Sequence, residues 1–160
     1  MHAGNAGINL AVKPIEGTQS NWQLFNENLP EIGIGAVWIV LHNAQSEAID
    51  LSKAKWSLEV GRQEYAPATA SQMLKRYYKK RHIRMHTIKA DETARRNLEG
   101  LALHLDRVGP SMDSSGFLFF QIEPTRAANW TRNGTLRLKS ITLSQGRQIT
   151  ISLPLSYANP

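Results

Sequence analysis

Alternation of apolar and polar residues is the feature of this sequence that most limits how the chain can fold. In the segment 148–155, isoleucine or leucine occupies every second position. The segment 8–13 alternates in the same way, and Trp56, Leu58 and Val60 repeat the pattern. Successive side chains of a strand point to opposite faces of a sheet, so a period of two predicts strands with one buried face. The chain is therefore predicted to be mainly β.

Other segments predict strands of a different kind. Residues 36–41 are all apolar, and their length and β-branched content are typical of a central strand rather than a helix. Residues 116–122 predict a short aromatic strand, and residues 113–116 before it are predicted as loop. The apolar positions of 136–143 change phase once, which predicts a bulge. Pro154 confines the last strand to an edge of its sheet or to its own end.

The middle of the chain has helical spacing instead. A helix is predicted over 69–80, where apolar and tyrosine side chains recur four residues apart. A second helix is predicted over 91–102, with Asp91 and Glu92 at the end where the helix dipole favours acidic residues.

Six or seven short strands joined by turns predict an immunoglobulin-like antiparallel β-sandwich, because one antiparallel sheet would leave an apolar face uncovered. The length of 160 residues is typical of one domain. We therefore predict a single β-sandwich domain over 1–160, with a helical and basic insertion at about 68–107 between the early and late strands. Trp22, Leu24 and Phe25 are predicted to cover an open end of the core.

Several segments of the chain follow an order found in a known family. They are 37–43, which ends in an asparagine, then 49–51, 58–61 and a run from Gly61 to Pro67 that contains a tyrosine. A glycine also precedes the aromatic strand at 116–120. In these features the chain resembles the telokin-like, immunoglobulin-fold domains of bacterial lipoproteins and other exported proteins. The resemblance implies an extracytoplasmic, non-catalytic accessory domain, and it implies no functional residues, because that family has no common active site.

The absence of cysteine excludes several classes of site. Disulfides, cysteine-ligated zinc, iron–sulfur clusters and thiol catalysis all require that residue. The sequence also lacks a nucleophile elbow, a phosphate-binding loop and a dinucleotide fingerprint. Its carboxylate pairs lie in polar stretches, where nothing prepares them for acid–base catalysis. We therefore predict a protein that is not an enzyme and that holds no small-molecule cofactor.

A histidine pair raises the question of a metal site. His82 and His86 stand four residues apart, which on a helix brings two imidazoles to one face, and His104 or His42 can supply a third ligand. However, the glutamate of the metalloprotease signature is missing from this pair. We predict no metal site.

Positive charge is concentrated in one segment. Between Ala66 and Ala90 there are seven basic residues and no acidic one, whereas the rest of the chain has twelve basic and thirteen acidic residues. The candidate binding residues in this segment are Lys75, Arg76, Tyr77, Tyr78, Lys79, Lys80, Arg81 and Arg84. On a helix, the cations at 75, 76, 79 and 80 form a stripe. Such a stripe can follow a phosphate backbone while the tyrosines stack on bases, or it can lie on an anionic membrane.

The competing interpretation is an ordinary amphipathic helix, which buries its tyrosines on the sandwich and exposes its lysines to water. In that case Arg76 and Arg81 are expected to pair with Asp91, Glu92 or Glu99.

The leading functional hypothesis is a non-catalytic binding or assembly module outside the cytoplasm, whose partner is another protein or the cell envelope. The alternative is a polyanion-binding protein that holds nucleic acid or anionic lipid through the basic helix 75–84. The first residues lack the basic and apolar regions of a signal peptide, so a periplasmic or secreted location requires that a signal has been removed. No apolar run approaches the roughly 20 residues that span a bilayer.

Overall fold

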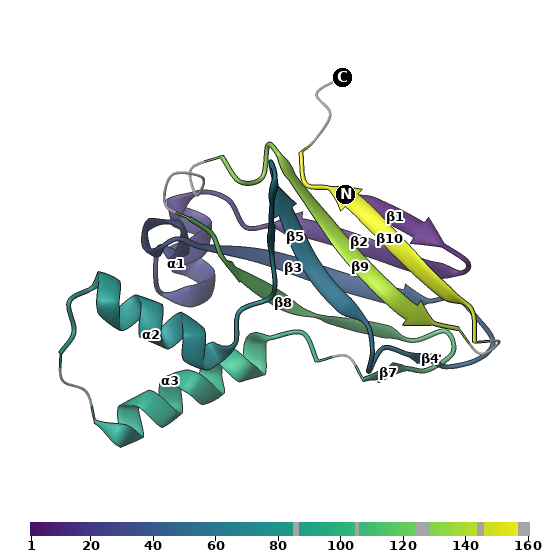
Figure 1. Cartoon of the computed structure of the whole chain (residues 1–160). Coiled ribbons are helices and arrows are strands. Elements are labelled where there is room, and N and C mark those ends of the chain that lie inside the picture. The colour runs from purple at the N-terminus through teal and green to yellow at the C-terminus, as the bar shows by residue number, and fades with distance from the viewer. Residues whose placement is uncertain (85–86, 105, 124–128, 144–145, 157–160) are drawn as a thin grey trace.

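The structure, a computed structural model, describes residues 1–84, 87–104, 106–123, 129–143 and 146–156. Its strands form two antiparallel sheets that lie face to face, with helices toward one end (Figure 1). The first sheet has the strand order β1-β2-β3-β8, formed by β1 (His2–Asn5), β2 (Ile8–Pro14), β3 (Ile34–Asn43) and β8 (Asp113–Gln121). The second has the order β6-β5-β9-β4-β7 with β10 paired to β9, and is formed by β4 (Ile49–Asp50), β5 (Lys55–Val60), β6 (Gln63–Tyr65), β7 (Arg107–Val108), β9 (Gly134–Thr142) and β10 (Gln148–Pro154). The prediction of a mainly β protein is confirmed.

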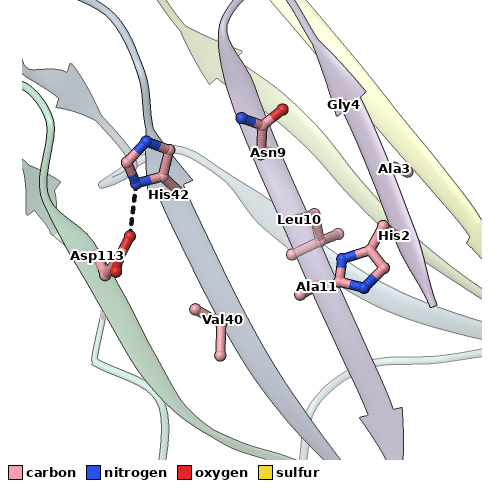
Figure 2. Close-up of a pocket in the computed structure, with 9 residues that line it drawn as sticks. All are labelled: His2, Ala3, Gly4, Asn9, Leu10, Ala11, Val40, His42 and Asp113. Carbon is pink, nitrogen blue, oxygen red and sulfur yellow. Dashed lines mark hydrogen bonds and ion pairs between the residues drawn. The ribbon is translucent and has the colours of Figure 1, made fainter.

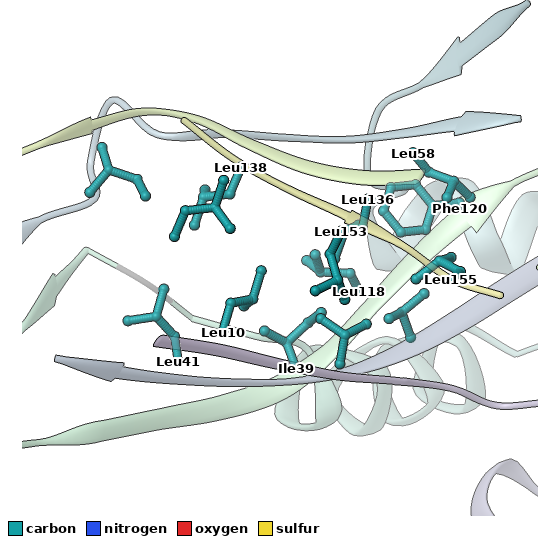
Figure 3. Packing of buried hydrophobic residues seen from close by; sticks show 14 of the residues in the cluster. Leu10, Ile39, Leu41, Leu58, Leu118, Phe120, Leu136, Leu138, Leu153 and Leu155 are labelled. Carbon is teal, nitrogen blue, oxygen red and sulfur yellow. The ribbon is translucent and has the colours of Figure 1, made fainter. Parts of the chain in front are cut away.

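Apolar side chains from the two sheets meet between them and form the main core (Figure 3). The first sheet contributes Leu10, Ile39, Leu41, Leu118 and Phe120. The second contributes Leu58, Leu136, Leu138 and Leu153, and Leu155 joins them just beyond the end of β10. In β10 the buried and exposed residues alternate without interruption, as the sequence pattern predicts. The alternating segments of the sequence are therefore the half-buried strands of this core.

The first half of β3 is buried on both faces, and the outer face of the second half is partly covered, which explains why its sequence is a continuous apolar run. One face carries Val37 and Ile39 into the core between the sheets. The other face carries Ile34 and Ala36 into a second apolar cluster on the outside of the first sheet. Strands covered on both faces have nearly continuous apolar sequences. The prediction of a central strand is confirmed, since β3 lies between β2 and β8.

Helical segments from two distant parts of the chain contribute to the second cluster on the outer face of the first sheet. They are α1 (Thr18–Phe25), the 3-10 helix η1 (Leu29–Ile32), α2 (Ala70–Lys80) and α3 (Ile88–Leu101). Phe25 of α1 meets the rings of Phe117 and Phe119 edge-on, at centroid distances of 5.0 and 5.7 Å. Met73 of α2 and Leu98 of α3 pack into the same cluster. The predicted helical insertion therefore completes an apolar core instead of extending freely from an edge.

The two long helices begin at capping residues. Thr69 accepts a hydrogen bond from the Gln72 backbone, and the Gln72 side chain accepts one from the Thr69 backbone, so α2 begins with a capping box where a helix is predicted. α3 begins at Ile88, three residues before the predicted start. The reason is Thr87, whose hydroxyl accepts a hydrogen bond from the backbone of Ala90.

The predicted irregularities of the last strands are confirmed. The register between β9 and β10 shifts between Ile149 and Ile151, and Ser140 of β9 adopts a left-handed φ of 59°. One extra residue on β9 therefore forms a bulge, which accounts for the change of apolar phase in its sequence. Pro154 ends β10, where its missing N–H costs no ladder hydrogen bond.

Two sequence predictions about the strands and the cover of the core are wrong. The loop expected before the aromatic strand belongs to β8, which begins at Asp113 and pairs with β3 as far as His42. Trp22 and Leu24 do not cover the core, because they are 47% and 48% exposed on α1. Phe25, at the end of the same helix, is the member of this group that packs against the second cluster.

Asn43, at the end of β3, ties the two sheets together. Its side chain is fully buried, and Nδ2 lies 2.8 Å from the carbonyl oxygen of Glu47, 3.1 Å from that of Val108 and 2.9 Å from that of Gly109. Its Oδ1 accepts a hydrogen bond from the backbone of Gln45 at 3.0 Å. Val108 belongs to β7, so this one amide joins the first sheet to the edge of the second while satisfying its own polar atoms.

We expect Gly116→Ala to lower the free energy of unfolding by about 2–3 kcal/mol. The chain that leaves α3 runs beside β8 here, and a Cβ on Gly116 would lie 2.5 Å from the Cα of Leu103 and 3.0 Å from the carbonyl carbon of Ala102. Urea denaturation followed by circular dichroism measures the change. The control is Gly100→Ala in α3, where a Cβ meets nothing within 4 Å and alanine is expected to stabilise the helix by up to about 1 kcal/mol. Equal effects of the two substitutions would contradict this account.

Candidate functional site

The basic segment of the sequence occupies α2 and the start of the connection after it. α2 and α3 pack against each other as a helical hairpin, and α2 also contacts η1. The ends of the two helices that residues 81–87 join point away from the sheets (Figure 1). The eight candidate residues divide into two groups. Four of them hold the hairpin together or fix it to the body of the protein, and the other four face water.

Arg76 fixes α2 to the body of the protein. Its Nε donates to the carbonyl oxygen of Ile32 at 2.6 Å, and its Nη2 donates to that of Ile122 at 2.9 Å. The guanidinium lies against Gly33, where a Cβ would meet Nη2. The prediction that Arg76 belongs to an exposed stripe or pairs with an acid of α3 is therefore wrong. Carbonyls at the end of η1 and just beyond β8 are its partners.

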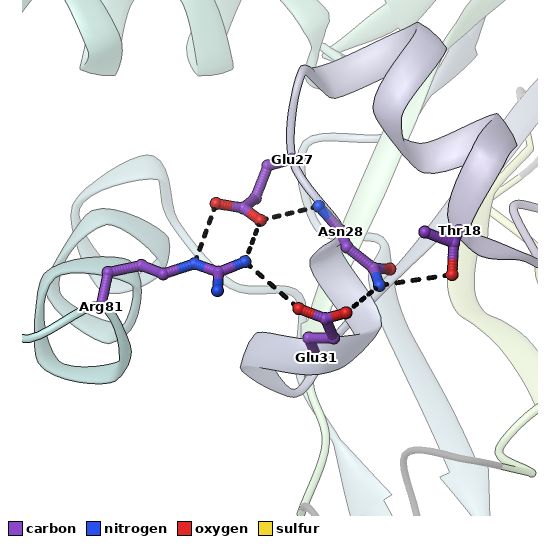
Figure 4. Close-up of polar contacts among 5 residues, drawn as sticks. All are labelled: Thr18, Glu27, Asn28, Glu31 and Arg81. Atoms are coloured by element: carbon purple, nitrogen blue, oxygen red, sulfur yellow. Dashed lines mark hydrogen bonds and ion pairs between the residues drawn. The ribbon is translucent and has the colours of Figure 1, made fainter.

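Arg81, just beyond α2, makes a second attachment (Figure 4). Its Nη2 lies 2.5 Å from Oε1 of Glu27 and 3.3 Å from Oε2 of Glu31, and its Nε lies 3.3 Å from Oε2 of Glu27. Asn28 supports both acids, because its backbone N–H donates to Glu27 and its side-chain amide donates to Glu31. The expected pairing of Arg81 with an acid of α3 is wrong, since the ion pairs reach the segment between α1 and η1 instead.

Both tyrosines make contacts within the protein. Tyr77 packs against the second apolar cluster. The Tyr78 hydroxyl donates to Oδ1 of Asp91 at 3.0 Å and so joins α2 to α3. Burial and this hydrogen bond raise the pKa of Tyr78 above its usual value, so the phenol keeps its proton and remains a donor at neutral pH.

The remaining four candidates are Lys75, Lys79, Lys80 and Arg84, which we call the free cations. All four side chains are exposed, and within the described ranges none of their charged groups takes part in a hydrogen bond or an ion pair. Lys75 and Lys79 are four residues apart on α2 and so share one face of the helix. Positive charge on this face is therefore not neutralised by the described part of the chain.

An apolar groove lies between α1 and the helical hairpin. Its volume is about 490 Å³, and its apolar lining includes Leu24, Phe25, Met73, Tyr77, Leu98 and Leu101. Leu24 and Leu101 are 48% and 38% exposed, so apolar surface at the groove remains in contact with water. The sequence does not predict this groove, because it depends on α1, whose exposed Trp22 and Leu24 obscure any one-sided helical pattern.

A histidine–aspartate pair lies in a shallow depression of about 580 Å³ on the outer face of the first sheet (Figure 2). Nδ1 of His42 is 2.6 Å from Oδ1 of Asp113, with the two side chains 41% and 66% exposed. In a catalytic triad, such a pair orients an imidazole beside a nucleophilic hydroxyl or thiol. The residues that line the depression include no hydroxyl or thiol, so the geometry is that of an exposed surface pair.

The histidines considered for a metal site lie on different elements. His82 follows α2, His104 follows α3 and donates from Nε2 to the Glu99 carbonyl oxygen, and His42 lies on β3. His86 lies outside the described residues. Within the described ranges, no group of three histidines or acids is close enough to hold an ion. The same ranges contain no helix that is long and apolar enough to cross a bilayer.

No family model and no curated protein sequence matches this chain. Among solved structures, a functionally unknown protein from Listeria monocytogenes is 13% identical, with a TM-score of 0.51, and the match covers 96% of this chain and 80% of that one. A Bacillus subtilis protein described as a "putative lipoprotein" is 7% identical, with a TM-score of 0.45, and the match covers 96% of this chain and 38% of that one. This chain therefore spans well under half the length of the Bacillus protein. The similarity to the Listeria protein concerns the fold.

We expect Arg76→Met to lower the free energy of unfolding by about 2–3 kcal/mol, because methionine fills similar space but leaves two backbone carbonyls without donors. Urea denaturation measures this loss. Lys75→Met removes the same charge from an exposed position one residue away and is expected to change stability by less than about 0.5 kcal/mol. If both substitutions have the same effect, Arg76 does not attach the hairpin.

Proposed function

We propose that this chain is a non-catalytic, extracytoplasmic binding module that attaches to an anionic surface or polymer through the free cations of its helical hairpin. The observation that carries the proposal is the division of the basic segment. Arg76 and Arg81 are bound within the protein, whereas Lys75, Lys79 and Lys80 extend into water with no partner in the described ranges. The contacts of Arg76 and Arg81 attach the hairpin, and they leave this second set of charges available to a partner.

Electrostatic attraction is strong enough to make such a surface useful. A lysine or arginine close to an anionic membrane contributes about 1 kcal/mol of binding free energy. The attraction decays over about 8–10 Å at ordinary ionic strength, so the charges must approach their target closely. The joined ends of the hairpin point away from the sheets (Figure 1), and Lys80, the last residue of α2, lies at that end.

The location and the non-catalytic role rest on the sequence. The segments around Asn43, Gly61 and Tyr65 resemble telokin-like, immunoglobulin-fold domains of exported bacterial proteins. We accordingly propose that the two packed sheets are an immunoglobulin-like sandwich.

Another protein is the second candidate partner, and the groove between α1 and the hairpin favours it. Apolar surface that remains exposed at Leu24 and Leu101 is typical of a site that an apolar segment of a partner covers. The double variant Leu24→Gln, Leu101→Gln changes this surface and leaves all charges in place. It therefore separates a role of the groove from a role of the free cations.

We expect the triple variant Lys75→Gln, Lys79→Gln, Lys80→Gln to bind heparin, used as a model polyanion, at least about tenfold more weakly than the wild-type protein. The affinity of the wild-type protein is expected to fall steeply as salt is added. Isothermal titration calorimetry at low and moderate salt measures both effects.

The matched control is Lys13→Gln, Lys55→Gln, Arg62→Gln, which removes three exposed charges from the β body. It has the same net charge as the hairpin variant. A difference in heparin affinity between the two variants therefore shows that the position of the charges matters, and not only their number. Equal loss in both variants, or no loss in the hairpin variant, would reject the proposed site.

A further inference from the structure

We infer that the anionic partner is a lipid bilayer, and that the joined end of the hairpin contacts it with the Ile88 side chain inserted at the headgroup level. This inference rests on the proposed function and makes it more specific. The hairpin tip is defined here as Lys80, Arg84, Ile88 and Lys89, four of the exposed described residues beside the connection between α2 and α3. Arg81, His82 and Thr87 are also exposed there, but Arg81 is bound to Glu27 and the other two are not part of the proposed contact.

Ile88 is the first observation that points to lipid. It is the first residue of α3, and its side chain is 79% exposed, the highest value among the exposed large hydrophobic residues of the described chain. A side chain in this position makes little contribution to the packing of the hairpin. Removing its apolar surface from water is favourable in proportion to the area covered, and a bilayer boundary supplies that cover.

Cations at the same end of the hairpin supply the second observation. Lys80 is the last residue of α2 and Lys89 is the second residue of α3, so both border the connection that contains Arg84. Their charged groups have no partner in the described ranges. Lysine and arginine side chains are long enough to keep their charges among lipid phosphates while a neighbouring apolar residue enters the boundary below. The tip therefore combines the apolar and electrostatic parts of a peripheral membrane contact.

The structure also ties up several side chains that a nucleic-acid partner would use. Base stacking needs free aromatic faces, yet Tyr77 packs in the second apolar cluster and Tyr78 is tied to Asp91. Bidentate phosphate recognition is a property of arginine, yet Arg76 and Arg81 are bound to carbonyls and carboxylates of the chain itself. The residues left exposed are mainly lysines, which act as point charges and suit a fluid array of phosphates.

Vesicle binding tests the apolar part of this contact. The probe is phosphatidylcholine vesicles with and without phosphatidylglycerol, and co-sedimentation measures the affinity of the full chain. We expect binding only when phosphatidylglycerol is present. Ile88→Gln is expected to weaken it about tenfold, while Ile88→Leu stays within about twofold of the wild type. The exposure of Ile88 predicts that both variants fold normally, and urea denaturation checks this.

Insertion can be observed directly because the chain contains no cysteine. An Ile88→Cys variant carries a nitrobenzoxadiazole label at that position only, and its fluorescence is expected to rise and shift to shorter wavelength on anionic vesicles. A label on Gln148→Cys, at the exposed start of β10, is the matched control and is expected to show no change.

The outcomes separate this inference from the proposed function. If Ile88→Gln binds anionic vesicles as the wild type does, or if the label at 88 stays in water, the lipid inference is wrong, even where the triple lysine variant has lost heparin binding. Tighter binding to single-stranded DNA than to the vesicles also overturns it. If the triple lysine variant retains full affinity for heparin, the proposed anion binding itself is wrong.

Discussion

Burial of the first half of β3 on both faces is the constraint on which the rest of this structure depends. Its inner side chains require the second sheet, and its outer side chains, such as Ile34 and Ala36, require a cover of their own. That cover comes from α1 and η1 before the strand and from the helical hairpin after β6. The insertion is therefore part of the folding unit, because without it an apolar face of the first sheet would lie in water.

Attachment of the hairpin determines which basic residues remain free. Arg76 serves two backbone carbonyls at once, a role that suits the several fixed N–H donors of a guanidinium and not a single ammonium group. Arg81 uses the same property toward the carboxylate of Glu27. The lysines of α2 extend into water, and Arg84, beyond the end of the helix, joins them. The chemistry of the two side chains thus separates a structural group from an exposed group within one short segment.

Sequence patterns predict the strands because the burial of a strand determines which of its consecutive residues are apolar. The alternation of β10 and the apolar run of β3 are examples. They also predict α2, whose cap and apolar spacing are local. They do not predict the partners of Arg76, because Ile32 and Ile122 lie 44 and 46 residues away along the chain. Contacts of this kind depend on which surface a helix covers. Because every residue has a backbone carbonyl, the residue types in the sequence do not indicate which carbonyls accept these hydrogen bonds.

Folding accounts for some of the free cations but not for all of them. Lys79 and Lys80 lie in the last turn of α2, where the negative end of the helix dipole attracts positive charge. Lys75 lies near the middle of the helix, four residues from Lys79, and like charges at that spacing repel each other by about 0.2–0.5 kcal/mol. No described contact of Lys75 offsets this repulsion. The charge of Lys75 therefore slightly lowers the stability of the folded chain. A favourable interaction of this charge requires an anion outside the chain, and for this reason we assign anion binding to this face of α2.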